Sequence, residues 1–400
     1  MAEQRHGPQA RRAFLGTAAA LGAVALLAGC QVIPKGRPQP QPPEPVRPAP
    51  EPEPAPDTGN LPGDANRNRV AVLVPLSGPN GGVGKSISNA ANLALMDTGG
   101  DTVRITIYDT ANGAAAAANA ALADGNRLFL GPLMAEDVTA IAPIARRAGV
   151  PVIAFSNDTS VAGDGVYLMG FDPTQSVGRV VEHARSQRMQ RFAGLIPDGV
   201  YGRRASQALI AAVERSGGRM VAMQSFDRSP RALQMAIGRL NGQSEYDAVL
   251  IADNGRLALT AAPLIRSGSS GRAQILGTEL WRAETGLAAA PALRGAWFAG
   301  VSDNLFNQLR TRYRARYGVT PYRLASLGYD AVLLTVRIGK TWRTGRPFPQ
   351  NALLDSGGFA GVDGAFRFGR DGVAHRSLAV LQVGPSGLTT ISPAPRDFAD

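Results

Sequence analysis

The chain has 400 residues, of which 44 % are hydrophobic and 18 % charged, enough for one large or two linked globular domains. Its net charge of +11 comes almost entirely from arginine, because the only lysines are Lys35, Lys85 and Lys340. The sequence contains no run of five basic residues and no zinc-finger spacing. The composition therefore indicates a dispersed arginine surface and argues against a nucleic-acid partner.

Residues 1–29 have the layout of a secretory signal peptide. A basic segment precedes an apolar run over residues 13–28, and small residues then lead to the only cysteine, Cys30. The stretch LAGC resembles the lipobox of bacterial lipoproteins, which implies that Cys30 is lipidated and becomes the new N-terminus. RRAFLG resembles a twin-arginine export signal, and the general secretory route is the alternative. We therefore expect a periplasmic protein whose only attachment to the membrane is a lipid anchor.

Residues 30–66 contain the expected lipidated cysteine and a proline-rich tether. Proline stands at nearly every second position from Pro34 to Pro62, and it excludes helix and sheet because it lacks an N–H group and fixes φ. An extended chain of this kind rises about 3.1 Å per residue, so these 29 residues would span roughly 90 Å. The segment is thus predicted to hold the globular part away from a membrane.

Beyond residue 66, short apolar runs alternate with helical stretches, as in parallel sheets covered on both faces. The expected strands are 69–76, 103–109, 127–131, 150–155, 191–197, 219–226, 246–253 and 273–279. The expected helices are 84–96, 111–124, 137–148, 202–216, 231–240, 304–317 and 324–342. Eight such units exceed one open sheet of usual size, and a break over 167–178 predicts an α/β fold with two doubly wound parallel-sheet lobes. Near the C-terminus, alternation around Asp371-Gly372 predicts a β-hairpin.

The first expected strand leads into LSGPNGGVGKS, residues 76–86, which superficially matches a nucleotide-binding loop. A Walker A loop needs a glycine five residues before its Gly-Lys-Ser, because consecutive backbone amides surround the phosphates. Position 79 is proline, and the preceding glycine, Gly78, is one residue too far away. Asp109, at the end of the second strand, occupies the place of a Walker B acid, but many parallel strands end in Asp. The pattern argues against a nucleotide hydrolase.

Other catalytic sets are also missing from the sequence. The mature chain has only His183 and His375, and its one cysteine is the expected lipidation site. GSSG at 268–271 is not a nucleophile elbow, and no group of acids and histidines has metal-ligand spacing. We expect no enzyme activity, no catalytic residue, no bound metal and no cofactor.

Residues 69–391 resemble the type I periplasmic binding-protein superfamily, especially its leucine/isoleucine/valine-binding branch. The matching stretches are VAVLVPLSGPNGGVG, ITIYDT, FLGPLMAEDVTAIAPIARRAGVPVIAFSND, PDGVYGRRASQAL, YDAVLIADN and GFAGVDGAFRFGRDGVAHRSLAVLQV. The resemblance implies two lobes joined by three crossing segments, with ligand held in an interlobe cleft at strand C-termini. The crossings are expected near 170–173, 296–301 and 345–349. Lobe 1 is then 67–171 plus 300–346, and lobe 2 is 172–299 plus 347–392.

The resemblance also implies the cleft residues. Tyr201 matches a tyrosine that lines the second lobe, and Glu279 matches an acid that meets a ligand's α-ammonium group. The full candidate set is Ser77, Gly78, Ala135, Glu136, Ser156, Asn157, Asp158, Tyr201, Asn254 and Glu279.

Several of these positions depart from the amino-acid-binding pattern. Ala135 replaces a serine, Asn157 or Asp158 stands where a threonine is usual, and Asn254 replaces an aromatic residue. A ligand carboxylate would face Glu136 and Asp158, and like charges within about 4–6 Å disfavour binding. Alternatively, these polar residues cap helices, as Asp and Asn commonly do. Both interpretations stay open at the level of the sequence.

The altered cleft, the lipid anchor and the tether resemble those of lipoprotein activators of penicillin-binding proteins. The resemblance implies a non-enzymatic protein that docks on a peptidoglycan synthase, and Gln31 after the cysteine fits outer-membrane sorting. The alternative is a solute-binding lipoprotein that delivers an amino acid or related small polar ligand to an ABC transporter. A nucleotide hydrolase is the third hypothesis, and it requires turnover that depends on Lys85.

Overall fold

The structure, a computed structural model, describes residues 66–301 and 303–395. These residues belong to one compact unit, Gly59–Asp400. The expected signal peptide, Cys30 and the tether up to residue 65 lie outside the described residues, so these predictions stay predictions.

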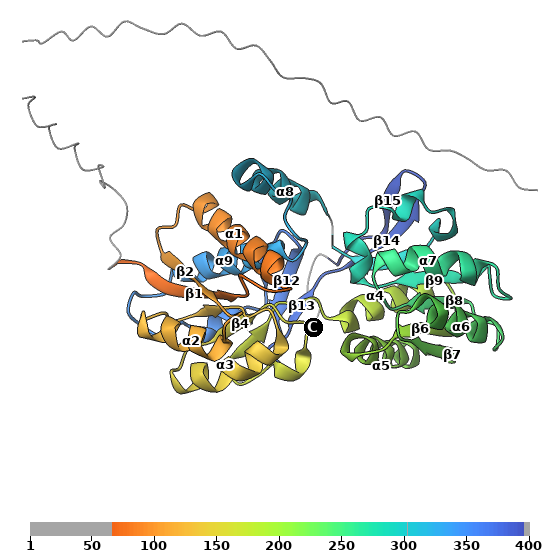
Figure 1. Ribbon diagram of the computed structural model, residues 1–400, viewed down its shortest axis with the longest axis horizontal. Coiled ribbons are helices and arrows are strands. Elements are labelled where there is room, and N and C mark those ends of the chain that lie inside the picture. The colour runs from red at the N-terminus through yellow and green to blue at the C-terminus, as the bar shows by residue number, and fades with distance from the viewer. Residues whose placement is uncertain (1–65, 302, 396–400) are drawn as a thin grey trace, which may run out of the picture. The chain divides into compact units, whose positions relative to one another are not determined.

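A five-stranded parallel sheet forms the first lobe, in the order β2-β1-β3-β4-β5 (Figure 1). Its strands are β1 (Asn68–Val74), β2 (Val103–Asp109), β3 (Phe129–Leu130), β4 (Val152–Ala154) and β5 (Val166–Leu168). Its helices are α1 (Gly81–Asp97), α2 (Ala114–Ala123), α3 (Ala135–Arg147), α8 (Asp303–Tyr317) and α9 (Ala325–Gly339).

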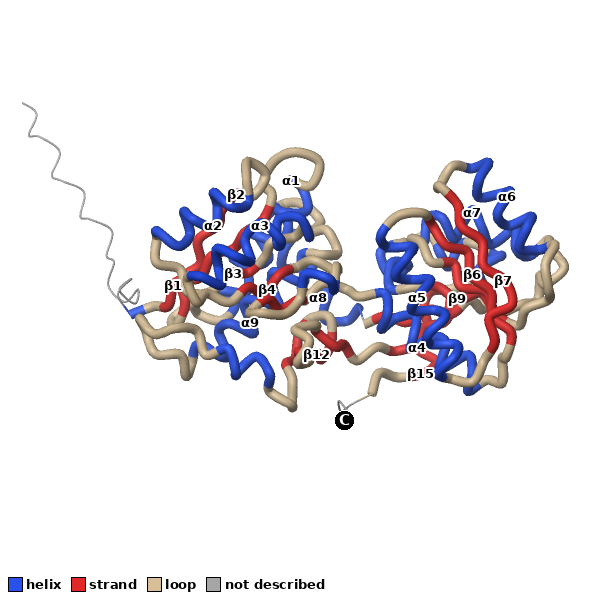
Figure 2. The backbone as a smooth tube through the Cα atoms, turned by 90° about the horizontal axis from the view of Figure 1, so that it is seen from below, coloured by secondary structure: helices blue, strands red, loops and turns tan. Residues whose placement is uncertain are grey.

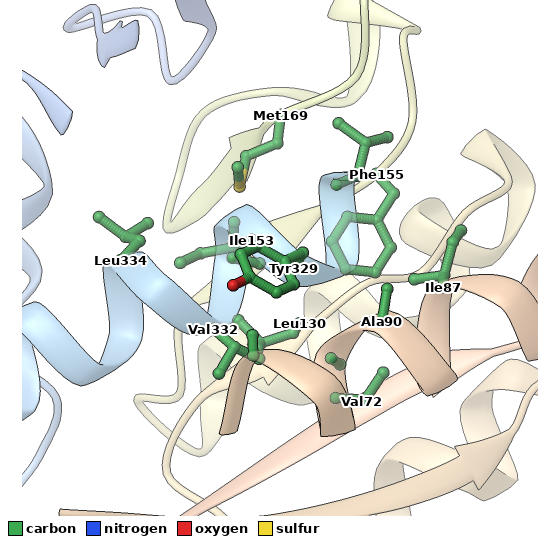
Figure 3. Close-up of a cluster of buried hydrophobic side chains, with 14 of the residues drawn as sticks. Val72, Ile87, Ala90, Leu130, Ile153, Phe155, Met169, Tyr329, Val332 and Leu334 are labelled. Atoms are coloured by element: carbon green, nitrogen blue, oxygen red, sulfur yellow. The ribbon is translucent and has the colours of Figure 1, made fainter. Parts of the chain in front are cut away.

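Side chains of β1 alternate between two hydrophobic cores, which makes the lobe doubly wound. Val70, Val72 and Val74 face the core that contains α1 and α9, whereas Ala71 and Leu73 face α2 and α3. Figure 3 shows the first of these cores, in which Val72 of β1 lies among side chains of the other strands and of both helices. Because both faces of the sheet are buried, its strands appear in the sequence as nearly continuous apolar runs.

The second lobe has a seven-stranded sheet in the order β15-β14-β10-β9-β8-β6-β7. Its parallel strands are β6 (Arg191–Pro197), β7 (Arg219–Phe226), β8 (Ala248–Ile251), β9 (Gln274–Gly277) and β10 (Trp297–Gly300). At one edge, β14 (Ala379–Gly384) and β15 (Gly387–Ser392) pair antiparallel. Helices α4 (Pro173–Ser186) and α5 (Val200–Arg215) cover one face, and α6 (Pro230–Asn241) and α7 (Gly255–Arg266) cover the other.

A small antiparallel sheet is formed by β11 (Phe359–Gly361), β12 (Gly364–Phe368) and β13 (Ala374–Arg376), and Figure 2 shows it beneath the first lobe's strands. The turn between β12 and β13 contains Asp371 and Gly372, and Gly372 has a φ of 77°. Residues that carry a side chain rarely adopt this left-handed backbone conformation, which glycine adopts easily. The Asp-Gly signal therefore correctly predicted a hairpin.

The expected position of the third crossing, near 345–349, is wrong. Phe348, Leu353, Phe359 and Phe366 belong to the core of the first lobe, so residues 347–376 do not lie in the second lobe as expected. The chain enters the second sheet only at β14, which begins at Ala379. Sequence reasoning had no means to decide which lobe the buried aromatic residues of this segment pack against.

Among the helices and strands that were not predicted are β5, β10, α4 and α7. The strands are only three and four residues long, so periodicity could not mark them. For α4 a signal existed: Asp172 precedes Pro173, and its carboxylate accepts a hydrogen bond from the backbone N–H of Thr174 (3.0 Å). An Asp N-cap before a first-turn proline is a typical helix start.

Candidate functional site

The ten candidate cleft residues all follow the carboxyl ends of parallel strands. Ser77 and Gly78 follow β1, Ala135 and Glu136 follow β3, residues 156–158 follow β4, and Tyr201, Asn254 and Glu279 follow β6, β8 and β9. In doubly wound sheets this edge is where ligands bind.

The glycine-rich loop after β1 is held by contacts within the protein. The carboxylate of Asp109 accepts hydrogen bonds from the backbone N–H groups of Leu76 (2.8 Å) and Ala111 (2.9 Å). A Cβ atom on Gly84 would lie 1.8 Å from the carbonyl oxygen of Pro75, so this glycine permits close packing of α1 against the strand end. Lys85 is exposed on α1. The residues that suggested a nucleotide loop therefore have structural roles.

Glu279 is the centre of a hydrogen-bonded cluster in the second lobe. Its Oε1 atom accepts from the hydroxyl of Tyr201 (3.0 Å), and its Oε2 atom accepts from the hydroxyl of Ser176. Tyr201 in turn accepts from the hydroxyl of Thr278 (2.9 Å). Strand β9 and helices α4 and α5 thus bring together two residues that the sequence predicted and two that it missed.

The environment changes the acidity of this cluster. Burial raises the pKa of Glu279 to about 7, although the hydrogen bonds from Ser176 and Tyr201 lower it. Burial and the charge of Glu279 raise the pKa of Tyr201 well above its ordinary value. Glu279 therefore exchanges a proton near neutral pH, and only its ionised form attracts a ligand ammonium group.

Asp158 and Asn157 are joined to the second lobe by Arg204 of α5. The guanidinium of Arg204 pairs with the carboxylate of Asp158 and donates a hydrogen bond to the carbonyl oxygen of Asn157 (2.7 Å). Burial alone would raise the pKa of Asp158, but hydrogen bonds from Ser160 and Arg204 outweigh it and hold the pKa below its ordinary value. The carboxylate is thus neutralised by an arginine and is not left facing the cleft as an unpaired charge.

Two of the candidates are helix caps. Asn254 accepts a hydrogen bond from the backbone N–H of Leu257 (2.9 Å) at the start of α7, and Asp158 accepts from Ser160 (2.9 Å) at the start of a 3-10 turn (Thr159–Val161). Glu136 is exposed in the first turn of α3, beside the partly buried Ala135. The capping interpretation is therefore correct for Asn254 and Asp158.

A pocket of about 200 Å³ lies next to Glu279. It contains residues from the three segments that connect the lobes, which are Phe171 after β5, Val301 after β10 and Leu378 before β14. The remaining lining residues are Glu279, Leu280, Arg282, Ala283, Gly300, Arg323 and Leu324. Of the ten candidates, Glu279 alone contributes to the wall of this pocket.

Arg282 and Arg323, which sequence reasoning missed, also line the pocket, and each is paired with an aspartate. Arg282 pairs with Asp303 through two contacts, Nε to Oδ1 (2.7 Å) and Nη2 to Oδ2 (2.6 Å). Arg323 pairs with the fully buried Asp363. Arg282 comes only three residues after Glu279, a spacing that could have drawn attention to it, whereas nothing in the sequence places Arg323 near either residue.

Within residues 66–301 and 303–395, no three His, Cys, Asp or Glu side chains lie close enough together to hold a metal ion. None of the helices in these ranges is both long and apolar enough to cross a membrane.

Two doubly wound lobes with a pocket at their junction define the class of two-lobed binding proteins. The periplasmic binding protein family matches residues 68–387, which is most of the chain, and the chain belongs to this family. Membership implies a periplasmic location. The predicted resemblance to periplasmic binding proteins is confirmed, whereas the narrower similarity to activators of penicillin-binding proteins is not shown by any comparison.

Solved structures of low sequence identity share the fold. A protein of Rhodospirillum rubrum assigned to a branched-chain amino acid ABC transporter is 21 % identical, with a TM-score of 0.72 over 81 % of this chain and 100 % of that one. The isoleucine complex of LivJ from Streptococcus pneumoniae is 17 % identical, with a TM-score of 0.60 over 82 % and 100 %. A solute-binding protein of Rhodopseudomonas palustris BisB5, in complex with 3,4-dihydroxybenzoic acid, is 18 % identical, with a TM-score of 0.64 over 84 % and 98 %.

A curated relative matches part of the chain. Uncharacterized protein RP748 of Rickettsia prowazekii is 22 % identical over 178 residues, which are 44 % of this chain and 48 % of that protein. The match thus spans about half the length of this relative.

Proposed function

We propose that the protein is a non-enzymatic solute-binding protein that takes up an amino acid or a related small polar ligand and delivers it to an ABC transporter. The single observation that supports it most is the family match over residues 68–387, to which the leucine/isoleucine/valine-binding type of fold adds. This function was the alternative in the sequence analysis, and the comparisons favour it over the activator.

The junction of the lobes supports this proposal chemically. The pocket beside Glu279 is lined from both lobes, so a solute there contacts both lobes at once. Ligand sites in proteins are commonly apolar hollows with a few polar groups that orient the ligand. Here Glu279 offers a carboxyl group, and Arg282 and Arg323 offer guanidinium groups.

Calorimetry and thermal unfolding with amino acids and small organic acids test the proposal. A solute that binds only the folded protein stabilises it by about 2.7 kcal/mol at a concentration of 100 times Kd. We expect at least one solute to raise the melting temperature in proportion to its concentration. If no amino acid or organic acid in the panel does so at millimolar concentration, the proposed function is wrong.

A second candidate is the tethered activator of a peptidoglycan synthase, which uses the lobes as a docking module. One observation favours it: Asp158, Asn157, Asn254 and Glu279 already have hydrogen-bond partners inside the protein, so the cleft holds together without a solute. The lipobox and the proline-rich tether, which lie outside the described residues, are consistent with this role.

The two candidates differ in a direct assay. Addition of an activator raises the rate of glycan polymerisation by a purified penicillin-binding protein, whereas a solute carrier leaves that rate unchanged. Unchanged polymerisation with every synthase of the source cell, together with no enrichment of synthases in pull-downs, would remove the second candidate. Mass spectrometry of membrane fractions tests the proposed diacylation of Cys30 and the proposed outer-membrane location.

A further inference from the structure

Two arginines of the second lobe make polar contacts with the first lobe. Arg204, on α5, pairs with the carboxylate of Asp158 and donates a hydrogen bond to the carbonyl oxygen of Asn157 (2.7 Å). Arg282, which follows β9, contacts Asp303 at the start of α8, with Nε 2.7 Å from Oδ1 and Nη2 2.6 Å from Oδ2. These contacts join the lobes through side chains, in addition to the three backbone crossings.

A third contact between the lobes is made by the side-chain amide of Gln175, which belongs to α4 of the second lobe. Its Nε2 atom donates to the carbonyl oxygen of Ala374 in β13 (2.9 Å), and its Oε1 atom accepts from the backbone N–H of Arg376 (2.8 Å). Ala374 is fully buried in the core of the first lobe. We call the contacts of Arg204, Arg282 and Gln175 the interlobe bridges.

Two of the backbone crossings are also joined to each other. The guanidinium of Arg376, in the crossing before β14, donates from Nη2 to the carbonyl oxygen of Met169 (2.8 Å), in the crossing after β5. Its Cζ atom lies 4.8 Å from the ring centroid of Phe171 and 5.2 Å from that of Phe366, and a cation over an aromatic face is attracted to it. A hinge motion changes φ and ψ in the crossings, and the contacts of Arg376 oppose such changes in two of them.

The interlobe bridges resist separation because water reaches them poorly. The side chains of Arg204 and Arg282 are 19 % and 8 % exposed. Charge pairs in such positions are screened less than surface pairs, and their hydrogen bonds are of the strong, charge-assisted kind. The bridges start from three different elements of the second lobe, which are α5, the 3-10 turn Glu279–Ala283 and α4. A rotation of the lobes about one bridge therefore pulls the others apart.

We propose that the interlobe bridges hold the two lobes at a single angle when no ligand is bound. Periplasmic binding proteins commonly close around their ligands by hinge motion, and a ligand shifts such an equilibrium only by its difference in affinity for the two forms. In this chain the bridges supply, from the protein itself, the contacts between lobes that a bound solute would otherwise supply. This property goes beyond the proposed function, because it applies equally to a solute carrier and to a docking module.

Distances between spin labels on the two lobes test the proposal. Met96 in α1 and Met235 in α6 are exposed, and both are replaced by cysteine in the full chain after Cys30→Ser removes the only other thiol. Double electron–electron resonance then gives the distribution of distances between the lobes without ligand. Labels at Met96 and Thr139, both in the first lobe, give the reference width. We expect one interlobe population as narrow as the reference. A second population, or a width larger than the reference by more than about 2 Å, would overturn the proposal.

A triple variant removes the interlobe bridges through Arg204→Gln, Arg282→Gln and Gln175→Ala. We expect its interlobe distribution to shift or widen by more than about 2 Å, which is the size of a clear rearrangement between parts of a protein. The matched control carries the same kinds of change at three exposed positions, which are Arg146→Gln, Arg203→Gln and Gln207→Ala. The control should keep the native distribution. A triple variant that also keeps it would refute the proposal.

A double variant keeps the test decisive if the triple variant does not fold. Arg204→Gln combined with Arg282→Gln leaves Asp158 and Asp303 without their arginine partners, but the two aspartate side chains are 21 % and 35 % exposed, so water hydrates them. Circular dichroism checks that the labelled double variant is folded. We expect a wider interlobe distribution than in the native protein. An unchanged distribution in the folded double variant would show that the arginine bridges do not set the angle, and the proposal would fail.

Discussion

At the scale of the residue, Glu279 shows how a fold changes the acidity of a side chain. Its carboxyl group is enclosed by β9, α4 and α5, and burial raises its pKa from 4.5 to about 7. A carboxyl group with a raised pKa supports folding below its unfolded pKa, and this support is lost as the pH rises through the folded pKa. The native protein should therefore become less stable between about pH 4.5 and pH 7.

Glu279→Gln removes this titration. We expect the free energy of unfolding of the variant, relative to the native protein, to rise by up to about 3 kcal/mol from pH 4 to pH 8.5, since one pKa unit corresponds to about 1.4 kcal/mol. Urea unfolding at several pH values measures this difference. A difference that does not change with pH would show that Glu279 titrates normally.

Asn254 offers a test of a cap against a ligand contact. Asn254→Ala removes the hydrogen bond to the N–H of Leu257 and is expected to lower the free energy of unfolding by about 1 kcal/mol. Asn254→Asp retains an acceptor and is expected to retain stability. Solute affinity, measured by calorimetry, should be unchanged in both variants if the side chain is only a cap. A loss of affinity in Asn254→Ala with no loss of stability would assign Asn254 to the ligand.

At the scale of the element, two helices start with a glycine that lies against the preceding strand end. A Cβ atom on Gly84 in α1 would lie 1.8 Å from the carbonyl oxygen of Pro75, and one on Gly202 in α5 would lie 1.6 Å from that of Pro197. Both lobes therefore use glycine to bring a helix close to the end of its first strand. In the first lobe this need places a glycine directly before Lys85, which explains the resemblance to a nucleotide loop.

Gly84→Ala is expected to destabilise the protein by about 3 kcal/mol, because the carbonyl of Pro75 belongs to the backbone and cannot easily move away. Gly178→Ala in α4 is the control, since no heavy atom lies within 4 Å of its added Cβ. It should be neutral or stabilising by up to about 1 kcal/mol, as alanine favours helix. Chemical unfolding measures the free energy of unfolding of both variants. Equal stability of the two variants would contradict the proposed close contact.

At the scale of the whole molecule, Arg204 connects the two lobes through Asp158 and Asn157. Arg204→Gln is expected to lower the free energy of unfolding by about 1 kcal/mol near neutral pH. Because the pKa of Asp158 is lowered, this contribution is present above the ordinary Asp pKa and is lost as the pH falls through the folded pKa.

The control for this substitution is Arg203→Gln, which changes the exposed neighbouring arginine and should alter stability by less than about 0.5 kcal/mol. Denaturant unfolding of both variants at pH 7 and pH 3 gives the comparison. If Arg204→Gln and Arg203→Gln have the same effect at pH 7, the interlobe pair does not contribute to stability.

The sequence predicted most of the fold because parallel strands buried on both faces leave a strong local signal. Strands β2, β6 and β7 match their predicted bounds to the residue. Strands β5 and β10 were missed because they are too short to show periodicity. The lobe of residues 347–376 was wrongly predicted because their buried aromatic residues do not indicate which lobe they pack against.

Only part of the geometry of the candidate site was predictable. The sequence placed nine of the ten candidates after predicted strands and Glu279 at the end of one, and it selected Tyr201 and Glu279 through a family resemblance. It did not show that Ser176 donates to Glu279, that Arg204 neutralises Asp158, or that Arg323 reaches the same pocket as Arg282. These contacts join residues that are between 41 and 103 positions apart in the chain.

The sequence by itself determined the class of fold, the order of most of its strands and helices, and the failure of the nucleotide-loop spacing at Pro79. All of these depend on neighbouring residues or on fixed spacings, which a linear chain displays directly. Only the tertiary structure decided which lobe residues 347–376 join, which acids are paired, and which arginines line the junction pocket. These features depend on contacts between distant segments, and their energies arise only when folding removes the side chains from water.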